Sequence, residues 1–162
     1  MAIEVERRFL VHDSDWERGA QAPSQIRQAY LALTPEASIR IRISNGEAAT
    51  LTVKSAQAGI ERAEFEYAIP VEDAAELMLL RTGMVIDKQR HGVAVGEAHW
   101  EVDVFGGELR GLVIAEIELD DKDRSFERPP WLGEEITSDA RYSNASLAIH
   151  GLPDEAEPGD PD

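Results

Sequence analysis

The chain has 162 residues and a formal net charge of −16, with 32 acidic against 16 basic side chains and no cysteine. Its length and its 43% hydrophobic residues are typical of one folded domain with a substantial core. Phosphate backbones and anionic membranes attract basic proteins, so this charge argues against nucleic acid or a membrane as a partner. An anionic small molecule would need a local cluster of basic side chains.

We predict a single domain over residues 1–151 and an acidic disordered tail over residues 152–162, which is rich in Pro, Gly and carboxylates. No apolar run approaches the roughly 20 residues that cross a bilayer. The first residues alternate as a strand does and lack the basic start and apolar middle of an export signal. Together with the absence of cysteine, these features predict a cytoplasmic protein.

Apolar residues recur at every second position in eight segments, which is the pattern of strands with two different faces. In chain order the segments are residues 2–11, 25–33, 38–44, 48–55, 61–70, 84–95, 99–105 and 112–119. Eight strands joined by short turns favour a sheet that closes on itself and so removes its edges. We therefore predict a mainly β (α+β) fold, an eight-stranded antiparallel closed barrel with a few peripheral helices.

Two segments have helical rather than strand patterns. Residues 71–83 carry acids near their start, apolar residues at helical spacing and a glycine as a stop signal. Residues 137–151 end at Gly151 and begin with three residues that commonly cap helices, Thr137, Ser138 and Asp139. We expect one helix in each segment.

Charged side chains of one sign share one face of most of the predicted strands. In SIRIRIS, residues 38–44, three isoleucines alternate with Arg40 and Arg42, and in AEIEL Glu116 and Glu118 alternate with apolar residues. For any single strand, a solvated outer face is the simpler interpretation. Like charges side by side on a face repel, however, so a solvated face would more naturally mix the two signs. Segregated signs suit a site that holds a divalent cation with carboxylates and a polyanion with guanidinium and ammonium groups.

Eight segments, in their order and spacing, closely resemble the CYTH family, whose members are also called triphosphate tunnel metalloenzymes. They are IEVERRFLV, SIRIRIS, TLTVKS, AEFEYAI, DKQRHG, WEVDVF, AEIELD and ITSDARYSNASLA, and they extend from Ile3 to about Ile149. The resemblance implies an eight-stranded tunnel with charged side chains inside and aliphatic ones outside. It also implies metal-dependent hydrolysis of a triphosphate, most like that of the short bacterial tripolyphosphatases.

The resemblance also implies roles for individual residues. The family signature E-x-E-x-K matches Glu4 and Glu6, whereas Arg8 stands where the family has lysine. The expected ligands of Mg²⁺ or Mn²⁺, direct or through water, are Glu4, Glu6, Glu116, Glu118, Asp103 and Glu64. The expected phosphate-binding residues are Arg8, Arg40, Arg42, Lys54, Lys88, Arg90 and Arg141. The residues expected to take part in the chemical step are Glu4, Glu6, Arg8, Lys88 and Tyr30.

Two alternatives to a tripolyphosphatase stay open at this point. A class IV-type adenylyl cyclase would use the same metal to convert ATP to cyclic AMP and pyrophosphate. A non-catalytic module would bind polyphosphate or nucleotides and return them unchanged. In each case the expected partner is a small-molecule triphosphate, and the sequence is also compatible with a homodimer in which the aliphatic outer faces meet a second subunit.

Overall fold

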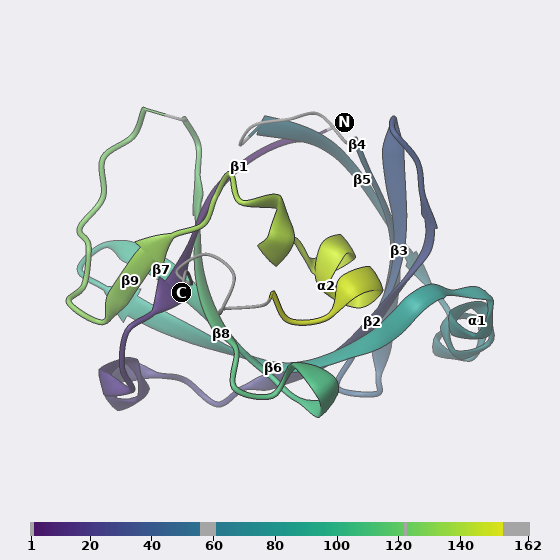
Figure 1. The fold of residues 1–162 in the computed structure, drawn as a ribbon, viewed down its shortest axis with the longest axis horizontal. Helices are drawn as coiled ribbons and strands as arrows, with labels where there is room; N and C mark the ends of the chain where they lie inside the picture. Colours follow the sequence, from purple (N-terminus) through teal and green to yellow (C-terminus); the bar gives the residue numbers. More distant parts are fainter. Residues whose placement is uncertain (1, 56–60, 122, 154–162) are drawn as a thin grey trace, which may run out of the picture.

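The computed structural model describes residues 2–55, 61–121 and 123–153, without the side chains of residues 2–4, 61 and 62. In these residues, antiparallel strands form one sheet that curls around a central space (Figure 1). The order across the sheet is β5-β4-β3-β2-β6-β7-β8-β1-β9. The strands are β1 (Ala2–Val11), β2 (Ser24–Leu33), β3 (Ala37–Ser44), β4 (Ala48–Ser55), β5 (Glu61–Ile69), β6 (Thr82–Val95), β7 (Ala98–Phe105), β8 (Val113–Leu119) and β9 (Leu132–Glu135).

Strand β1 has three neighbours because different parts of it pair with different strands. Residues 2–5 pair with β5, residues 5–10 pair with β8, and Phe9 and Val11 pair with β9. The pairing with β5 brings the far end of the sheet back to β1. The predicted mainly β fold and its eight strands are confirmed. Strand β9 was missed because its four residues, LGEE, hold one apolar side chain and show no period.

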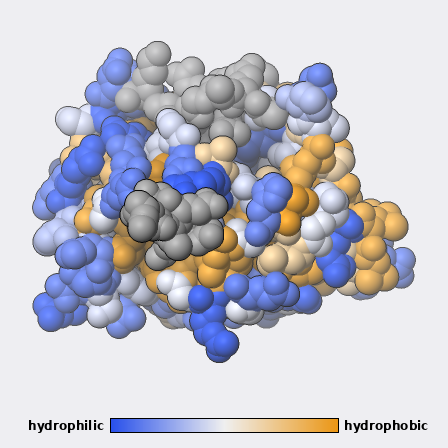
Figure 2. All heavy atoms as spheres, viewed as in Figure 1, coloured by the Kyte–Doolittle hydropathy of each residue, from blue (hydrophilic) through white to orange (hydrophobic). Residues whose placement is uncertain are grey.

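Helix α1 (Val71–Leu77) and the 3₁₀ turn η2 (Met78–Leu80) confirm the first predicted helix and lie on the outside of the sheet (Figure 1). Ala74 and Met78 pack on the outward isoleucines of β3, Ile41 and Ile43. Apolar surface also gathers on this side of the molecule in Figure 2, and the neighbouring side chains of Leu79 and Leu80 are largely exposed. No helix in the described residues is long and apolar enough to span a membrane.

Helix α2 (Asn144–His150) begins later in the chain than we predicted and follows the 3₁₀ turn η4 (Ala140–Tyr142). Asp139 caps η4, where its side chain accepts a hydrogen bond from the Arg141 N–H, and Ser143 caps α2 in the same way through the Ser146 N–H. The predicted capping residues thus start the short turn, and a separate serine starts the helix. The other 3₁₀ turns are η1 (Asp15–Gly19) and η3 (Gly107–Leu109).

Unlike α1, helix α2 is not peripheral, because it lies within the ring of strands (Figure 1). Leu147 and Ala148 are buried in one cluster with Tyr30 and Ile86 of the sheet. Gly83 allows this approach, because a Cβ at that position would lie 2.6 Å from the Ala148 carbonyl oxygen. The predicted tail lies mostly in residues 154–162, outside the described residues, so it stays a prediction.

Strand β9 is fastened to β1 by an ion pair that has two hydrogen bonds. Arg7 Nε donates to Glu135 Oε2 at 2.8 Å, and Arg7 Nη2 donates to Oε1 at 2.7 Å. These bonds lower the pKa of Glu135 below its ordinary value of 4.5. A carboxyl group whose pKa is lowered by folding stabilises the folded state at pH values above its pKa in the unfolded chain. This stabilisation is lost as the pH falls through the pKa in the folded state.

We therefore predict that Glu135→Gln is less stable than the wild type at neutral pH, by at most about 1 kcal/mol because the pair is partly solvated. The difference should shrink as the pH falls below about 4.5. Urea unfolding at a series of pH values measures it. Asp15→Asn is the control, since Asp15 pairs with Arg18 at 3.7 Å on the exposed surface. A difference independent of pH would contradict the prediction.

Candidate functional site

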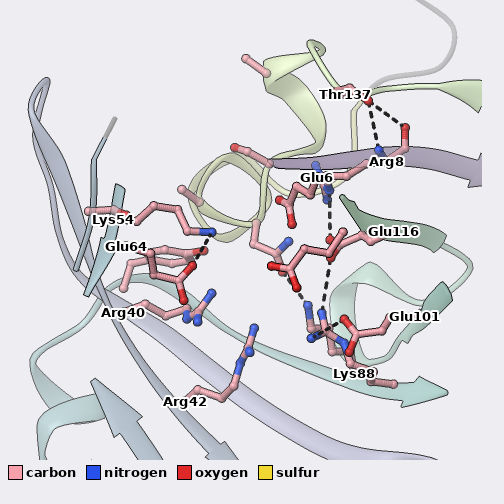
Figure 3. Close-up of a pocket in the computed structure, with 18 of the residues that line it drawn as sticks. Glu6, Arg8, Arg40, Arg42, Lys54, Glu64, Lys88, Glu101, Glu116 and Thr137 are labelled. Atoms are coloured by element: carbon pink, nitrogen blue, oxygen red, sulfur yellow. Dashed lines mark hydrogen bonds and ion pairs between the residues drawn. The ribbon is translucent and has the colours of Figure 1, made fainter. Parts of the chain in front are cut away.

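A cavity of about 680 Å³ lies inside the ring of strands, and its walls are predominantly charged (Figure 3). The basic side chains that line it are Arg8, Arg40, Arg42, Lys54, Lys88 and Arg90. The acidic ones are Glu6, Glu64, Glu66, Glu101, Glu116, Glu118 and Asp139. The polar face of the strands therefore points inward, and Ile41 and Ile43, which alternate with the arginines of β3, point outward beneath α1.

The two arginines of β3 have uncharged neighbours across the sheet. Arg40 lies opposite Thr52 and Tyr30, and Arg42 lies opposite Thr50 and Gln28. Among the described residues, neither arginine has a carboxylate within ion-pair distance. Burial lowers the pKa of Arg42 to about 10, and the positive charges of Arg40 and Arg90 act in the same direction. This wall of the cavity keeps an excess of positive charge.

Two buried guanidinium nitrogens, Arg8 Nη2 and Arg40 Nε, have no hydrogen-bond partner in the described residues. A buried N–H without an acceptor costs about 1–3 kcal/mol, so such groups are uncommon in folded proteins. Both belong to side chains that line the cavity. An anion in the cavity would supply the missing acceptors.

On the opposite wall, Asp103 is buried between two cations. Its Oδ2 lies 2.7 Å from Lys88 Nζ, and its Oδ1 accepts from Arg90 Nε at 2.7 Å. Asp103 is 1% exposed and Lys88 is 2% exposed. Burial would raise the pKa of Asp103, but the two cations outweigh it and hold this pKa well below its ordinary range. Burial lowers the pKa of Lys88, and Asp103 opposes that effect.

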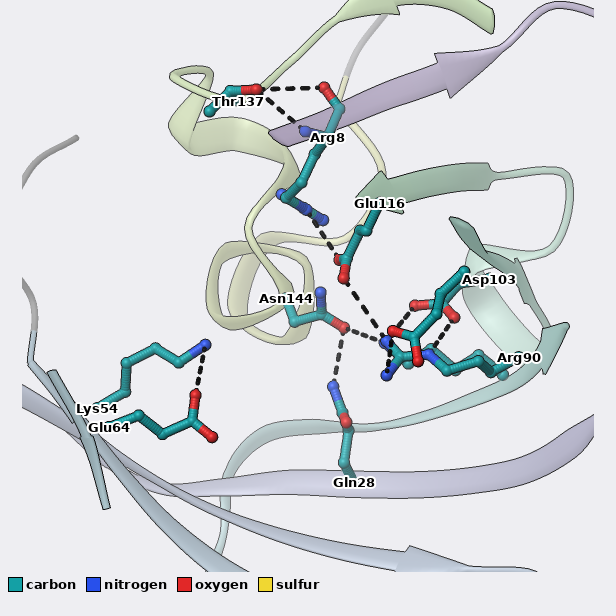
Figure 4. Close-up of polar contacts among 11 residues, drawn as sticks. Arg8, Gln28, Lys54, Glu64, Arg90, Asp103, Glu116, Thr137 and Asn144 are labelled. Carbon is teal, nitrogen blue, oxygen red and sulfur yellow. Dashed lines mark hydrogen bonds and ion pairs between the residues drawn. The ribbon is translucent and has the colours of Figure 1, made fainter. Parts of the chain in front are cut away.

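Glu116 lies between Arg8 and Arg90, the second of which also binds Asp103 (Figure 4). Its Oε2 accepts from Arg8 Nε at 3.1 Å, and its Oε1 lies 3.8 Å from Arg90 Nη2. Burial would raise the pKa of Glu116, but the positive charges of Arg8, Arg90 and Lys88 together outweigh it, so the pKa is lowered. Glu116 and Asp103, both predicted metal ligands, are thus occupied with cations of the protein in this structure.

Glu6 and Glu118 are arranged differently, because they face each other directly across β1 and β8. No group of three or more His, Cys, Asp or Glu side chains suited to a metal ion occurs in the described residues. Magnesium-type ions, however, commonly use one or two carboxylates and complete their coordination with substrate phosphates and water. Glu6 and Glu118 fit that requirement. Glu64 lies on β5, with its Oε1 3.8 Å from Lys54 Nζ. The side chain of Glu4 lies outside the described part of the structure.

The remaining predicted residues lie in two different places. Tyr30 lines the cavity and is almost fully buried. Arg141 does not line it, because its guanidinium turns back to Asp139, with Nη2 2.8 Å from Oδ2. The phosphate-binding role of Arg141 therefore stays a prediction.

Sequence analysis missed two uncharged side chains at the centre of the site, Gln28 and Asn144, which hydrogen-bond to each other at 2.8 Å (Figure 4). Glu66 and Glu101 also line the cavity but were not among the predicted site residues, although the sequence places each on the charged face of its strand. Gln28 is two residues before Tyr30 on β2, and this spacing was the available signal. Asn144 had no such signal, because α2 brings it to the cavity from another part of the chain.

A ring of antiparallel strands around a cavity lined by acidic and basic side chains defines the class of tunnel-like β proteins. Within that class the chain belongs to the CYTH domain family, which matches residues 2–152.

The chain resembles two curated proteins over nearly their whole length. It is 41% identical over 148 residues to an inorganic triphosphatase of Acetivibrio thermocellus, covering 91% of this chain and 94% of that protein. It is 36% identical over 150 residues to an inorganic triphosphatase of Nitrosomonas europaea, covering 90% and 97%.

Solved structures share the fold. One of an inorganic triphosphatase has a TM-score of 0.65 at 31% identity, covering 92% of this chain and 99% of that chain. A putative adenylate cyclase of Bacillus halodurans has a TM-score of 0.51 at 16% identity, covering 76% and 84%, and shows likeness of fold alone.

The buried cluster around Asp103 yields a prediction about stability. Asp103→Asn leaves two buried cations short of their shared counter-charge and should lower the free energy of unfolding by about 3–5 kcal/mol. Urea denaturation at neutral pH measures the loss. The matched control is Asp87→Asn, since Asp87 pairs with Arg27 at 3.0 Å on the surface and should contribute less than about 1 kcal/mol. Equal losses in both variants would contradict the prediction.

Proposed function

We propose that this protein is a metal-dependent triphosphatase that hydrolyses inorganic tripolyphosphate to pyrophosphate and phosphate. The observation that carries the proposal is the cavity itself, in which basic side chains with unused N–H groups share one space with a cross-strand pair of carboxylates. The two curated relatives named as inorganic triphosphatases support the reaction class.

The basic side chains bind the substrate. Arg40 and Arg42, with no carboxylate partner in the described residues, hold oxygens of the triphosphate, and Lys54 extends this surface along β4. Lys88 and Arg90 on β6 approach from the opposite wall. Charge-assisted hydrogen bonds to phosphate are stronger than neutral ones, and guanidinium groups can donate two at once. Arg141 would join this set only after leaving Asp139.

The carboxylates of β1 and β8 hold the metal. Glu6 and Glu118, with Glu4 of the signature, are the proposed ligands, and Mg²⁺ and Mn²⁺ both suit oxygen donors. A bound divalent cation neutralises charge on phosphoryl oxygens and increases the acidity of an attacking water. Asp103 and Glu116 orient Lys88, Arg90 and Arg8 instead of binding the ion directly, and Glu64 does the same for Lys54.

The chemical step needs a proton acceptor for water and positive charge for the leaving group. Glu4 or Glu6 accepts the proton from the water that attacks the terminal phosphorus. Arg8 and Lys88 stabilise the charge that develops on the departing pyrophosphate, and Tyr30 encloses the substrate beside Arg40. Fixed charges in a poorly hydrated cavity stabilise such a transition state more than they would in bulk water.

The lining of the cavity favours tripolyphosphate over ATP. Among its described lining residues, Tyr30 is the one aromatic side chain, and it is almost fully buried. A nucleobase is usually held by aromatic or apolar side chains, so the cavity offers little to bind adenine. The cyclase and the non-catalytic binding module therefore remain alternatives with weaker support. Cytoplasmic localisation and a homodimer stay predictions from the sequence.

We predict that the purified protein releases phosphate and pyrophosphate from tripolyphosphate with Mg²⁺ or Mn²⁺ and that EDTA abolishes this activity. Glu6→Gln and Glu118→Gln should each require higher metal concentrations, because each loses a charged ligand. Phosphate release and product chromatography measure both effects. Formation of cyclic AMP from ATP, with tripolyphosphate left intact, would support the cyclase; binding without turnover of either would support the binding module.

A second prediction concerns Arg8, where this chain departs from the family signature. Arg8→Lys should keep most of the activity, because lysine preserves the positive charge beside Glu116. Arg8→Ala should lose activity mainly in kcat, by about 100-fold or more, as expected for loss of charge at the transition state. Steady-state kinetics across pH compare the three proteins. A large gain in kcat for Arg8→Lys, with a new ionisation at high pH, would instead mean that the arginine weakens the enzyme.

A further inference from the structure

A chain of hydrogen bonds connects two cations of the cavity through two uncharged side chains, one of them on the first residue of α2 (Figure 4). Gln28 Oε1 accepts from Arg42 Nε at 2.9 Å, and Gln28 Nε2 donates to Asn144 Oδ1 at 2.8 Å. The same Asn144 oxygen accepts from Lys88 Nζ at 3.1 Å. Gln28 is fully buried, at 0% exposed.

The chemistry of the partners allows only one orientation of these two amides. Arg42 and Lys88 can only donate, so each must meet an oxygen. Gln28 therefore turns its oxygen to Arg42 and its NH₂ group to Asn144, and Asn144 must present its oxygen to both Gln28 and Lys88. Reversing either amide would place N–H groups against N–H groups. The donor and the acceptor of each hydrogen bond in the network are therefore determined.

We propose that Gln28 and Asn144 are positioning residues of the triphosphatase site, which hold the Arg42 guanidinium and the Lys88 ammonium in place for the triphosphate. This inference rests on the proposed function. Long cationic side chains lose rotamer freedom when they are fixed, and fixing them in advance makes substrate binding and catalysis more favourable.

Amide oxygens suit this task because they hold cations without neutralising them. Asp103 already provides a full negative charge to Lys88 and Arg90. A further carboxylate beside Arg42 would cancel positive charge that the triphosphate requires. The amides instead leave the positive charge unchanged and fix only its direction.

Helix α2 makes the position of Asn144 depend on the packing of the whole segment. Ser143 caps the helix, and Leu147 packs in the buried cluster with Tyr30 of β2, two residues beyond Gln28. The amide of Asn144 is therefore anchored on a rigid element. Truncating its side chain removes the link to Lys88 and Gln28 and leaves the packing residues of α2 in place.

The test compares Asn144→Leu, Asn144→Asp and Gln28→Met with wild type. Asn144→Leu keeps the side-chain shape without its acceptor, and we expect kcat for tripolyphosphate to fall about 10- to 100-fold, the range seen when supporting partners of metal ligands are removed. Asn144→Asp keeps the accepting oxygen and should recover most of kcat, with a higher KM because its negative charge repels the substrate. Gln28→Met should raise KM, because Arg42 binds substrate. The control is Gln25→Met, since Gln25 is exposed on the same strand and should leave both constants unchanged.

Melting temperature and tripolyphosphate binding in EDTA separate the outcomes. A loss of kcat in the folded Asn144→Leu protein, with recovery in Asn144→Asp, supports the inference. Constants within twofold of wild type for Asn144→Leu and Gln28→Met, or losses that only follow the unfolded fraction, overturn it. An inactive wild type refutes the proposed function instead. In that case tripolyphosphate binding in EDTA decides the inference. Weaker binding by both Asn144→Leu and Gln28→Met supports it. Binding as tight as that of the wild type in either variant, or no binding by the wild type itself, overturns it.

Discussion

The ion cluster of Asp103 with Lys88 and Arg90 is the interaction on which the site depends. Two cations cannot be kept in a nearly water-free wall without a negative charge between them, because the cost of removing ions from water exceeds what neutral partners return. Asp103 supplies that charge from β7 to two residues of β6, in neighbouring strands. The cluster thus allows the inner face of the sheet to be polar around the cavity, beside the apolar residues of that face that pack with α2.

Charge is compensated unevenly around the cavity, and this unevenness is what makes it a binding site. The cations near Asp103 and Glu116 are largely paired, whereas Arg40 and Arg42 meet threonine, tyrosine and glutamine. On β1 and β8, Glu6 faces Glu118 across the strands. The region of Arg40 and Arg42 therefore favours an added anion. In the proposed function a triphosphate would be that anion, and Glu6 and Glu118 would hold its metal ion.

The parts of the fold that the sequence predicts are those with a regular period. Alternation of apolar residues located all eight main strands, and repulsion between like charges correctly indicated that Arg40 and Arg42 do not lie on a solvated surface. Strand β9 has no period, and the start of α2 is decided by Ser143 because Asp139 is used in the preceding turn. The same use of Asp139 turns Arg141 away from the cavity. Gln28 and Asn144 carry no charge and are 116 residues apart, so only the folded chain reveals their contact.

Arg8 shows how the departure from the family signature fits the site. Its Nε–H is directed to Glu116 at 3.1 Å, and its buried Nη2 lacks a partner in the described residues. A guanidinium has five N–H donors in a rigid plane, so one edge can bind a carboxylate while another faces a phosphate oxygen. A lysine has a single nitrogen, which would have to lie between the two acceptors. In the proposed function, arginine at this position would neutralise Glu116 and also offer a donor to the substrate, and the contact between Arg8 and Glu116 need not break when a triphosphate enters.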